Sequence, residues 1–266
     1  MAYDARRGGI LARRAQSGIG VARLARRAFS TNGGDMKIGI IGAGNIGQVL
    51  ALRWTERGHD VLIGNSRGPA TLADVAAETG AKPAELADVV RDADVIVVTI
   101  PEKKVLNLPA GLFADVPDTT VIIDTGNYYP RERDGRIDGI ESGMLESEWV
   151  AKQIGRPVIK AFNNIYAAHL RNNGKPEGTQ GRIALPVSGD NADAKAVVMQ
   201  LVNEMGFDAF DNGGIANSWR HQPGAPVYTK DFDLEGLKAG LQKADKTRTP
   251  KWSATDKSPG SFEQPA

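Results

Sequence analysis

Residues 36–47 read Met-Lys-Ile-Gly-Ile-Ile-Gly-Ala-Gly-Asn-Ile-Gly, and this stretch decides the fold. It begins with a short apolar run from Lys37 to Ile41 that is rich in β-branched side chains, which is typical of a buried strand. A glycine-rich turn follows at once. Apolar residues at helical spacing then predict a helix from Gln48 to Arg57, with Gly58 as its left-handed end. Strand, glycine turn and helix in this order predict the opening of a Rossmann-type, dinucleotide-binding fold.

Each glycine of the turn has a physical task in such a site. Gly42 allows the tight turn, Gly44 lets backbone amides approach a pyrophosphate, and Gly47 lets the helix pack close to the strand. The start of the helix, with Asn45 and Ile46, presents unpaired amides and the positive end of the helix dipole, which favour an anion. We therefore expect these five residues to hold the diphosphate of a dinucleotide.

The second apolar run, Asp60 to Gly64, ends at Asn65-Ser66-Arg67, roughly 20 residues after the last glycine of the turn. An NAD enzyme usually has a carboxylate here to hold the ribose 2′-hydroxyl. The sequence instead offers an amide, a hydroxyl and a guanidinium, all of which can donate to a 2′-phosphate. NADP is therefore the expected cofactor, although Arg67 could also be a solvated turn residue.

Three further apolar runs read as buried parallel strands, at residues 94–101, 120–124 and 157–162. Ligands of open α/β sheets bind outside the carboxyl ends of the strands. The candidates for the nicotinamide side of the site are therefore Ile100, Pro101, Gly126, Asn127 and Asn163. For the two asparagines, local capping of a turn or helix is an equally good interpretation.

The last third of the chain predicts another strand, helix and strand, at residues 184–189, 193–205 and 207–210, as a further unit of the same sheet. Residues 212–228 contain too much Gly and Pro for regular structure, yet they are rich in aromatic, basic and amide side chains. We expect this loop to form a wall of the substrate pocket, with Trp219 and Arg220 as candidates. The alternative is a surface connection whose aromatic rings fill the core.

The length of 266 residues and the hydrophobic content of 41% suit one main α/β core with a small appendage. The expected fold class is thus a Rossmann-type, doubly wound, mostly parallel sheet with a small C-terminal extension. The expected organisation is an Arg-rich leader that is disordered or not part of the mature fold, an NADP-binding core, an extension that forms the substrate pocket and includes a short helix at 234–244, and a disordered tail. These parts cover residues 1–35, 36–165, 166–245 and 246–266, respectively.

The leader has two interpretations. It resembles a mitochondrial presequence, which would place the protein in the matrix, or it is an artefact of start-site choice before Met36 in a bacterial, cytoplasmic protein. The leader carries seven arginines against two aspartates, whereas the rest of the chain has 26 basic and 30 acidic residues. The acidic balance of the folded part argues against a nucleic-acid partner.

Composition excludes several chemistries. Without cysteine there can be no disulfide, thiolate metal site or cysteine nucleophile. The histidines His59, His169 and His221 are widely separated, so no metal site is expected. Charged residues or glycines interrupt every hydrophobic run, so no membrane helix is expected either. Redox chemistry would have to come from an organic cofactor.

Together these residues resemble the family of 8-hydroxy-5-deazaflavin-dependent NADP reductases and their bacterial relatives. The resemblance implies hydride transfer between NADPH and a deazaflavin stacked on the nicotinamide, usually in a homodimer, by positioning rather than by a protein acid or base. The chain departs from archaeal members at residues 162–164, so a flavin, a quinone or a small carbonyl compound is an alternative acceptor. The resemblance rests on the motifs at 41–47, 64–69, 159–163 and 211–226.

Two other functions compete with this interpretation. A β-hydroxyacid dehydrogenase or pyrroline-carboxylate reductase shares the opening motif, and Lys160 and Asn164 have the Lys-x-x-x-Asn spacing of the dehydrogenase. However, the glycines that should precede that lysine are missing, and the remaining hundred or so residues do not predict an all-helical second domain. The other competitor is a non-catalytic NADPH sensor. No side chain is predicted to act as a catalytic acid, base or nucleophile.

Overall fold

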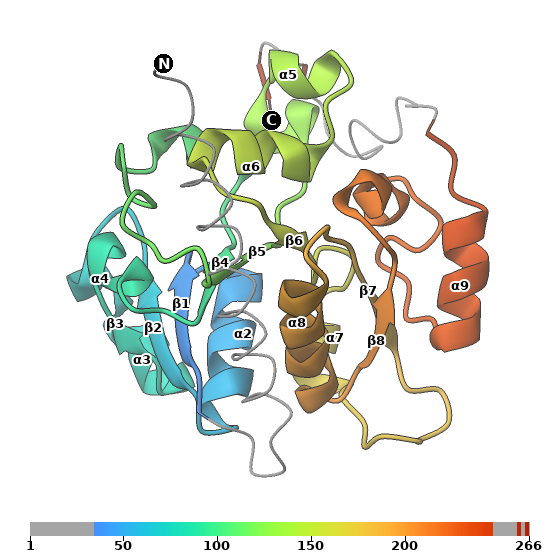
Figure 1. The fold of residues 1–266 in the computed structure, drawn as a ribbon, viewed down its shortest axis with the longest axis horizontal. Helices are drawn as coiled ribbons and strands as arrows, with labels where there is room; N and C mark the ends of the chain where they lie inside the picture. Colours follow the sequence, from blue (N-terminus) through green and yellow to red (C-terminus); the bar gives the residue numbers. More distant parts are fainter. Residues whose placement is uncertain (1–34, 247–259, 262–263, 266) are drawn as a thin grey trace, which may run out of the picture.

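The structure, a computed structural model, describes residues 35–246, 260–261 and 264–265. The expected leader lies outside these residues except for Asp35, and so does most of the expected disordered tail. Within that tail, Gly260 is buried and its carbonyl accepts a hydrogen bond of 2.8 Å from Arg131 Nε. A large sheet flanked by helices and a smaller sheet beside it make up the molecule (Figure 1).

Neighbouring strands of the large sheet all run parallel, in the order β3-β2-β1-β4-β5-β6. The direction of winding reverses between β1 and β4, which is where a Rossmann fold binds its ligand. This confirms the expected doubly wound, mostly parallel α/β fold. The strands are β1 (Lys37–Ile41), β2 (Asp60–Gly64), β3 (Lys82–Pro83), β4 (Val95–Val98), β5 (Val121–Asp124) and β6 (Ile159–Lys160).

Helices pack on both faces of this sheet (Figure 1). On one face lie α2 (Asn45–Thr55), α3 (Ala73–Thr79), α7 (Ala167–Asn172) and α8 (Ala192–Glu204). On the other face lie α4 (Leu86–Val90), η2 (Glu102–Asn107), α5 (Asp138–Glu141) and α6 (Glu146–Ile154). Two short segments are η1 (Pro69–Leu72) and η3 (Pro130–Asp134).

The first two helices differ from their predicted bounds. α2 begins three residues before the predicted Gln48, because its first turn forms directly on the glycine turn. The sequence also predicts a helical stretch from Ala70 to Thr79, but the structure divides it into the 3-10 turn η1 and α3. The Thr71 amide and hydroxyl both bond the Gly68 carbonyl, at 3.2 and 2.8 Å, and this holds the tighter i to i+3 geometry.

Side chains of the central strands alternate between the two faces of the sheet. In β1, Ile38 and Ile40 belong to the apolar cluster under α2 and α8, whereas Ile41 belongs to the cluster under α4 and α6. Alternate residues of β4 divide in the same way. A parallel strand buried on both faces needs apolar residues at every position, which explains the continuous Val and Ile runs in the sequence.

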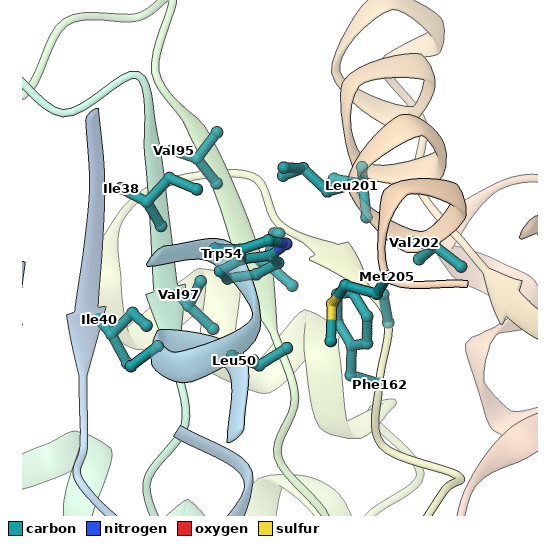
Figure 2. Close-up of a cluster of buried hydrophobic side chains, with 14 of the residues drawn as sticks. Ile38, Ile40, Leu50, Trp54, Val95, Val97, Phe162, Leu201, Val202 and Met205 are labelled. Atoms are coloured by element: carbon teal, nitrogen blue, oxygen red, sulfur yellow. The ribbon is translucent and has the colours of Figure 1, made fainter. Parts of the chain in front are cut away.

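Trp54 of α2 sits at the centre of the larger cluster, where it lies between the sheet and α8 (Figure 2). Its ring meets Phe162 edge-on, with centroids 5.8 Å apart, and Leu201 and Met205 lie close by. At the end of the same helix, His59 Nε2 lies 3.0 Å from Glu204 Oε2 of α8. The C-terminal extension thus shares one hydrophobic core with the dinucleotide-binding part of the chain.

The expectation that the last strand-helix-strand unit extends the large sheet is wrong. β7 (Ala184–Val187) and β8 (Asp208–Asp211) form a separate parallel pair, which lies between α8 and α9 (Leu234–Gln242) (Figure 1). Its connection to the large sheet is one antiparallel bridge between Lys160 and Ser188. β6 spans only two residues, and Phe162 then adopts a φ of 62°, so the chain turns away before a longer ladder can form.

The prediction that residues 212–228 lack regular structure is also wrong in part. Ile215–His221 form the 3-10 helix η4. This stretch contains neither Gly nor Pro, which are confined to its two flanks, so the chain can wind between them. The 3-10 geometry of η4 sets the directions in which the side chains of Trp219, Arg220 and His221 point.

Candidate functional site

The glycine turn after β1 is held by close backbone contacts. The Gly42 amide donates to the Gly64 carbonyl at 2.8 Å, and its φ of 117° is one that residues with a side chain rarely adopt. A Cβ at Gly42 would lie 2.3 Å from the Thr99 carbonyl oxygen, and one at Gly47 would lie 2.1 Å from the Gly42 oxygen. These two glycines therefore serve the fold itself.

Gly44 differs from these two glycines. A Cβ there would meet no atom within 4 Å, and its φ of −80° suits any residue. The space is thus open to a ligand. Gly44 precedes α2 and has no side chain to cap the helix, while Asn45 beside it is exposed. Uncapped amides beneath an open space fit the diphosphate of a dinucleotide.

The loop after β2 is ordered by Asn65. Its side-chain oxygen accepts the Arg67 amide at 2.8 Å, and its Nδ2 donates to Thr71 Oγ1 at 3.0 Å. Ser66 and Arg67 are exposed, and no partner of the Arg67 guanidinium is found among the described residues. Asn65 thus shapes the turn, while Ser66 and Arg67 remain available to a phosphate on the ribose.

The remaining predicted cofactor residues lie at the carboxyl ends of β4 and β5. Ile100 and Pro101 are half-buried, and Gly126 is buried. A Cβ at Gly126 would lie 2.5 Å from Glu102 Oε1 and 3.0 Å from Asp124 Oδ1. Since β4 and β5 are neighbours, the topology brings these three residues to one edge of the sheet beside the glycine turn.

Asn127 and Asn163 bond to each other across the ends of β5 and β6. Asn127 Nδ2 donates to the Asn163 carbonyl at 2.8 Å, and Asn163 Nδ2 donates to Asn127 Oδ1 at 3.0 Å and to the His221 carbonyl at 2.8 Å. The pair joins two strand ends to η4. Asn163 is buried, whereas Asn127 is half-buried and lies nearer the surface.

His221 continues this network. Its Nδ1 lies 2.7 Å from Asn163 Oδ1, which can only accept, so we assign the imidazole proton to Nδ1. Nε2, 3.0 Å from Ser188 Oγ, then accepts the hydroxyl proton, while Ser188 Oγ accepts from Asn212 Nδ2 at 3.0 Å. Burial and the nearby Lys160 ammonium lower the pKa of His221 to about 3, so the ring stays neutral.

A second buried polar cluster lies beside the first. Asp124 accepts three hydrogen bonds, from the Gly126 amide at 2.8 Å, Ser147 Oγ at 2.7 Å and Lys160 Nζ at 3.0 Å. Lys160 and Asp124 are 0% and 1% exposed. Burial, the largest single effect, would lower the pKa of Lys160, but Asp124, Glu102 and Glu146 together outweigh it, and the pKa is raised overall. Asp124 and Lys160 thus form a buried ion pair at the carboxyl ends of β5 and β6.

The sequence analysis missed this cluster, although one signal was present. Asp124 and Lys160 each end an apolar strand that is buried on both faces, and buried charges need a partner. The neighbouring strands could therefore have been predicted to pair these two residues. Glu102, which is 0% exposed in the same cluster, carries no such signal because it begins a short helical turn after Pro101.

The two candidates on η4 have different surroundings. The Arg220 guanidinium lies over the Trp219 ring, 4.5 Å from its centroid, and donates to the Leu241 carbonyl at 3.0 Å. Trp219 also borders a cavity of about 150 Å³ between η4 and the start of α6, together with Met144, Leu145 and Gln222. The structure thus places Trp219, but not Arg220, on the wall of a cavity.

Metal sites and membrane-spanning helices are both absent from the described residues. No group of three His, Asp or Glu side chains there has the arrangement of a metal site. In the same part of the chain, no helix combines the length and the apolar character that crossing a bilayer requires.

Residues 37–128 match the model of the family described as NADP oxidoreductase, coenzyme F420-dependent. The amino-terminal, dinucleotide-binding part of the chain is therefore similar to this family. The match to the F420-dependent NADP oxidoreductases covers the glycine turn, the Arg67 loop and Gly126. It does not reach Lys160, Asn163 or His221, which lie beyond the matched residues.

Two curated relatives match parts of the chain. The protein YjhV of Escherichia coli (strain K12) is 48% identical over 91 residues, which are 34% of this chain and 59% of YjhV. The metalloreductase STEAP3 of Rattus norvegicus is 27% identical over 183 residues, which are 68% of this chain and 35% of that protein. Each match therefore covers less than two thirds of the relative's length.

Solved structures resemble more of the chain. A hypothetical protein, SMa0349 from Sinorhizobium meliloti, is 31% identical with a TM-score of 0.63, over 75% of this chain and 95% of that one. A candidate F420-dependent NADP-reductase from Arthrobacter sp. FB24 is 25% identical with a TM-score of 0.53, over 69% of this chain and 87% of that one. These matches extend past the residues covered by the family model.

Proposed function

We propose that this protein binds NADP and transfers a hydride between its nicotinamide and a small flavin-like or deazaflavin-like acceptor. The observation that carries the proposal is the pair of adjoining loops after β1 and β2. An open space at Gly44 lies over the uncapped start of α2, and a loop without a carboxylate presents the Arg67 guanidinium, which has no partner in the described part of the chain. Together they suit a diphosphate and a ribose 2′-phosphate.

Arg67 decides the preference between the two coenzymes in this proposal. One charged hydrogen bond of ~1.5 to 3 kcal/mol corresponds to roughly ten- to over a hundred-fold in affinity. NADH lacks the phosphate that would make this bond. A carboxylate at the same place would repel the phosphate and reverse the preference.

The acceptor is proposed from the family description and from the cavity at Trp219. The coenzyme F420 in the family description favours a planar deazaflavin ring. The cavity beside Trp219 offers an aromatic wall, and its volume of about 150 Å³ suits one ring of such a molecule. Hydride transfer between stacked rings depends on positioning, for which a rigid aromatic wall is suited. The same proposal includes two further points. The protein forms a homodimer, and its partner during turnover is the small-molecule redox acceptor.

The test is loss of the nicotinamide absorbance of NADPH on mixing with a deazaflavin, a flavin, a quinone and a small carbonyl compound in parallel. The proposal predicts oxidation with the deazaflavin or the flavin. Binding of NADPH without oxidation by any of the four would instead favour the non-catalytic sensor. Oxidation by the carbonyl compound alone would favour a dehydrogenase of the hydroxyacid or pyrroline-carboxylate type.

A pair of variants tests whether the cavity beside Trp219 takes part in turnover. Trp219→Ala should lower turnover with the preferred acceptor while leaving NADPH affinity within about twofold, because Trp219 lies away from the glycine turn and the Arg67 loop. Arg220→Ala is the comparison, since Arg220 stacks on the same ring without bordering the cavity. Equal losses of turnover and stability in Trp219→Ala would show that the ring only fills space.

A further inference from the structure

Glu102 is a buried acid that has no role in the proposed function. It follows Pro101 after β4, it is 0% exposed, and neither carboxyl oxygen has a hydrogen-bond partner among the described residues. Its Oε1 lies 2.5 Å from the position that a Cβ at Gly126 would occupy. The carboxyl therefore packs at the carboxyl ends of β4 and β5. This is where the nicotinamide ring lies if the proposed function is right.

The charges around Glu102 come from four different elements. Asp124 of β5, Glu146 of α6 and Asp134 of η3 are acidic, and Lys160 of β6 is basic. Lys160 donates to Asp124 and to the Gly126 carbonyl, and Asp134 is paired with Arg133 at 2.8 Å. Asp124 thus takes the hydrogen bond of the Lys160 ammonium, and Lys160 acts on Glu102 only through its charge.

This setting favours the protonated form of Glu102. Burial raises the pKa of Glu102 well above its ordinary value, Asp124 raises it further, and Lys160 offsets only part of the rise. A buried carboxyl without partners costs free energy that a neutral side chain of similar shape would avoid. Groups with such an environment beside a ligand site are candidates for function.

The nicotinamide ring changes its charge during turnover. It is neutral in NADPH and carries a positive charge in NADP⁺. A positive charge placed near a buried carboxyl favours the ionised form of that carboxyl. The proton occupancy of Glu102 and the redox state of the nucleotide are then linked, and each must influence the other equally.

We propose that Glu102 is a charge-compensating residue that holds a proton while NADPH is bound and gives that proton up when NADP⁺ takes its place. The step balances because NADPH gives a hydride to the acceptor and becomes NADP⁺. Glu102 at the same time loses one proton and becomes a carboxylate. The hydride and one proton together complete the two-electron reduction of the acceptor. Replacement of NADP⁺ by NADPH returns a proton from solvent to Glu102.

The experiment needs no acceptor. The full chain is titrated calorimetrically with NADP⁺ and with NADPH in two buffers of different ionisation enthalpy, which gives the protons released on binding each nucleotide. We expect NADP⁺ to release more protons than NADPH, by a fraction of a proton that peaks at a pH above the ordinary range of a glutamate, because burial raises the pKa of Glu102. Both nucleotides carry the same 2′-phosphate, so its own titration cancels in the difference.

Two variants make the result specific. Glu102→Gln keeps the shape of the protonated acid and should abolish the difference in proton release. At a pH where the carboxyl ionises, it should also weaken NADP⁺ relative to NADPH by about tenfold if the linked shift is about one pKa unit. Glu85→Gln, which removes an exposed carboxylate near Gly68, should leave the difference unchanged.

The outcomes separate this inference from the proposed function. Equal proton release for the two nucleotides, or a difference that survives in Glu102→Gln, overturns the inference while leaving NADP binding intact. Failure of either nucleotide to bind overturns the proposed function itself. If Glu102→Gln does not fold, the difference in proton release between NADP⁺ and NADPH is measured across pH in the unchanged protein. A difference of zero at every pH contradicts the inference.

Discussion

His221 shows how a single side chain joins the two parts of the molecule. Its ring bonds Asn163 after β6 and Ser188 after β7, and it belongs to η4. Each ring nitrogen has one partner in the neutral tautomer, so protonation would add a donor that faces the Ser188 hydroxyl and a charge near Lys160. The fold therefore depends on a neutral imidazole at this position.

A pH effect follows from the lowered pKa of His221. The folded pKa of about 3 lies below the ordinary value of 6.5, so between these values the unfolded chain binds a proton that the folded chain does not. Stability should fall as the pH drops through this window, by about 1.4 kcal/mol per pH unit from this group alone. The measurement is the free energy of unfolding by denaturant at several pH values.

The matched variant for this prediction is His221→Gln, which cannot titrate. Between about pH 6 and pH 4 its stability should depend on pH less steeply than that of the unchanged protein, by about the same 1.4 kcal/mol per unit. Identical slopes in the two proteins would mean that His221 is not buried in its neutral form.

At the level of single residues, the sequence predicted groups whose task is local. Gly42 and Gly47 could be assigned to the tight turn and to the close packing of the helix, because their spacing from one strand end is enough for that. The role of Arg67 stays a prediction. The bonds of Asn163 to Asn127 and to His221 could not be predicted, because these partners are 36 and 58 residues away in the chain. Such pairs depend on which strand ends the fold makes neighbours.

Elements of the large sheet were predicted best. Five of its six strands are apolar runs, so their existence follows from burial on both faces. The strand β3 (Lys82–Pro83) was not predicted, because two residues without apolar alternation give no strand signal. The pairing of β7 and β8 was predicted wrongly, because hydrophobic pattern indicates a strand but not its neighbour. The brevity of β6 and the positive φ of Phe162 decided that pairing.

The turn between β1 and α2 makes a prediction that separates fold from function. Gly44→Ala should leave the melting temperature nearly unchanged and weaken NADPH binding by at least about tenfold, because its methyl group would stand in the open space above the helix start. Gly47→Ala should instead lower stability by about 1 to 3 kcal/mol, since its methyl group would meet the Gly42 carbonyl. Thermal unfolding and nucleotide titration of both variants check this.

The two variants are each other's control, since both add one methyl group within the same turn. If Gly44→Ala binds NADPH as well as the unchanged protein does, no pyrophosphate lies over that glycine. If Gly47→Ala is fully stable, the close packing of α2 on β1 is not required.

At the scale of the whole molecule, two sheets share one core. Leu201 of α8 and Met205 at its C-terminal cap pack with Trp54 against the large sheet, as Figure 2 shows, and the bridge between Lys160 and Ser188 joins the sheets. The C-terminal part thereby brings η4 to the carboxyl ends of β5 and β6. Composition could predict a small extension. It could not predict that this extension places polar side chains of η4 at the edge of the proposed cofactor site.

The central claim is that the molecule holds a dinucleotide with a phosphate on its adenosine ribose, across the glycine turn and the Arg67 loop. The most direct test is an equilibrium titration of the full chain with NADPH and with NADH under identical conditions, repeated with Arg67→Ala. The account predicts that NADPH binds at least about tenfold more tightly than NADH, and that Arg67→Ala loses most of this preference while its NADH affinity stays nearly the same. Equal affinities for the two nucleotides, or binding of neither, would contradict it.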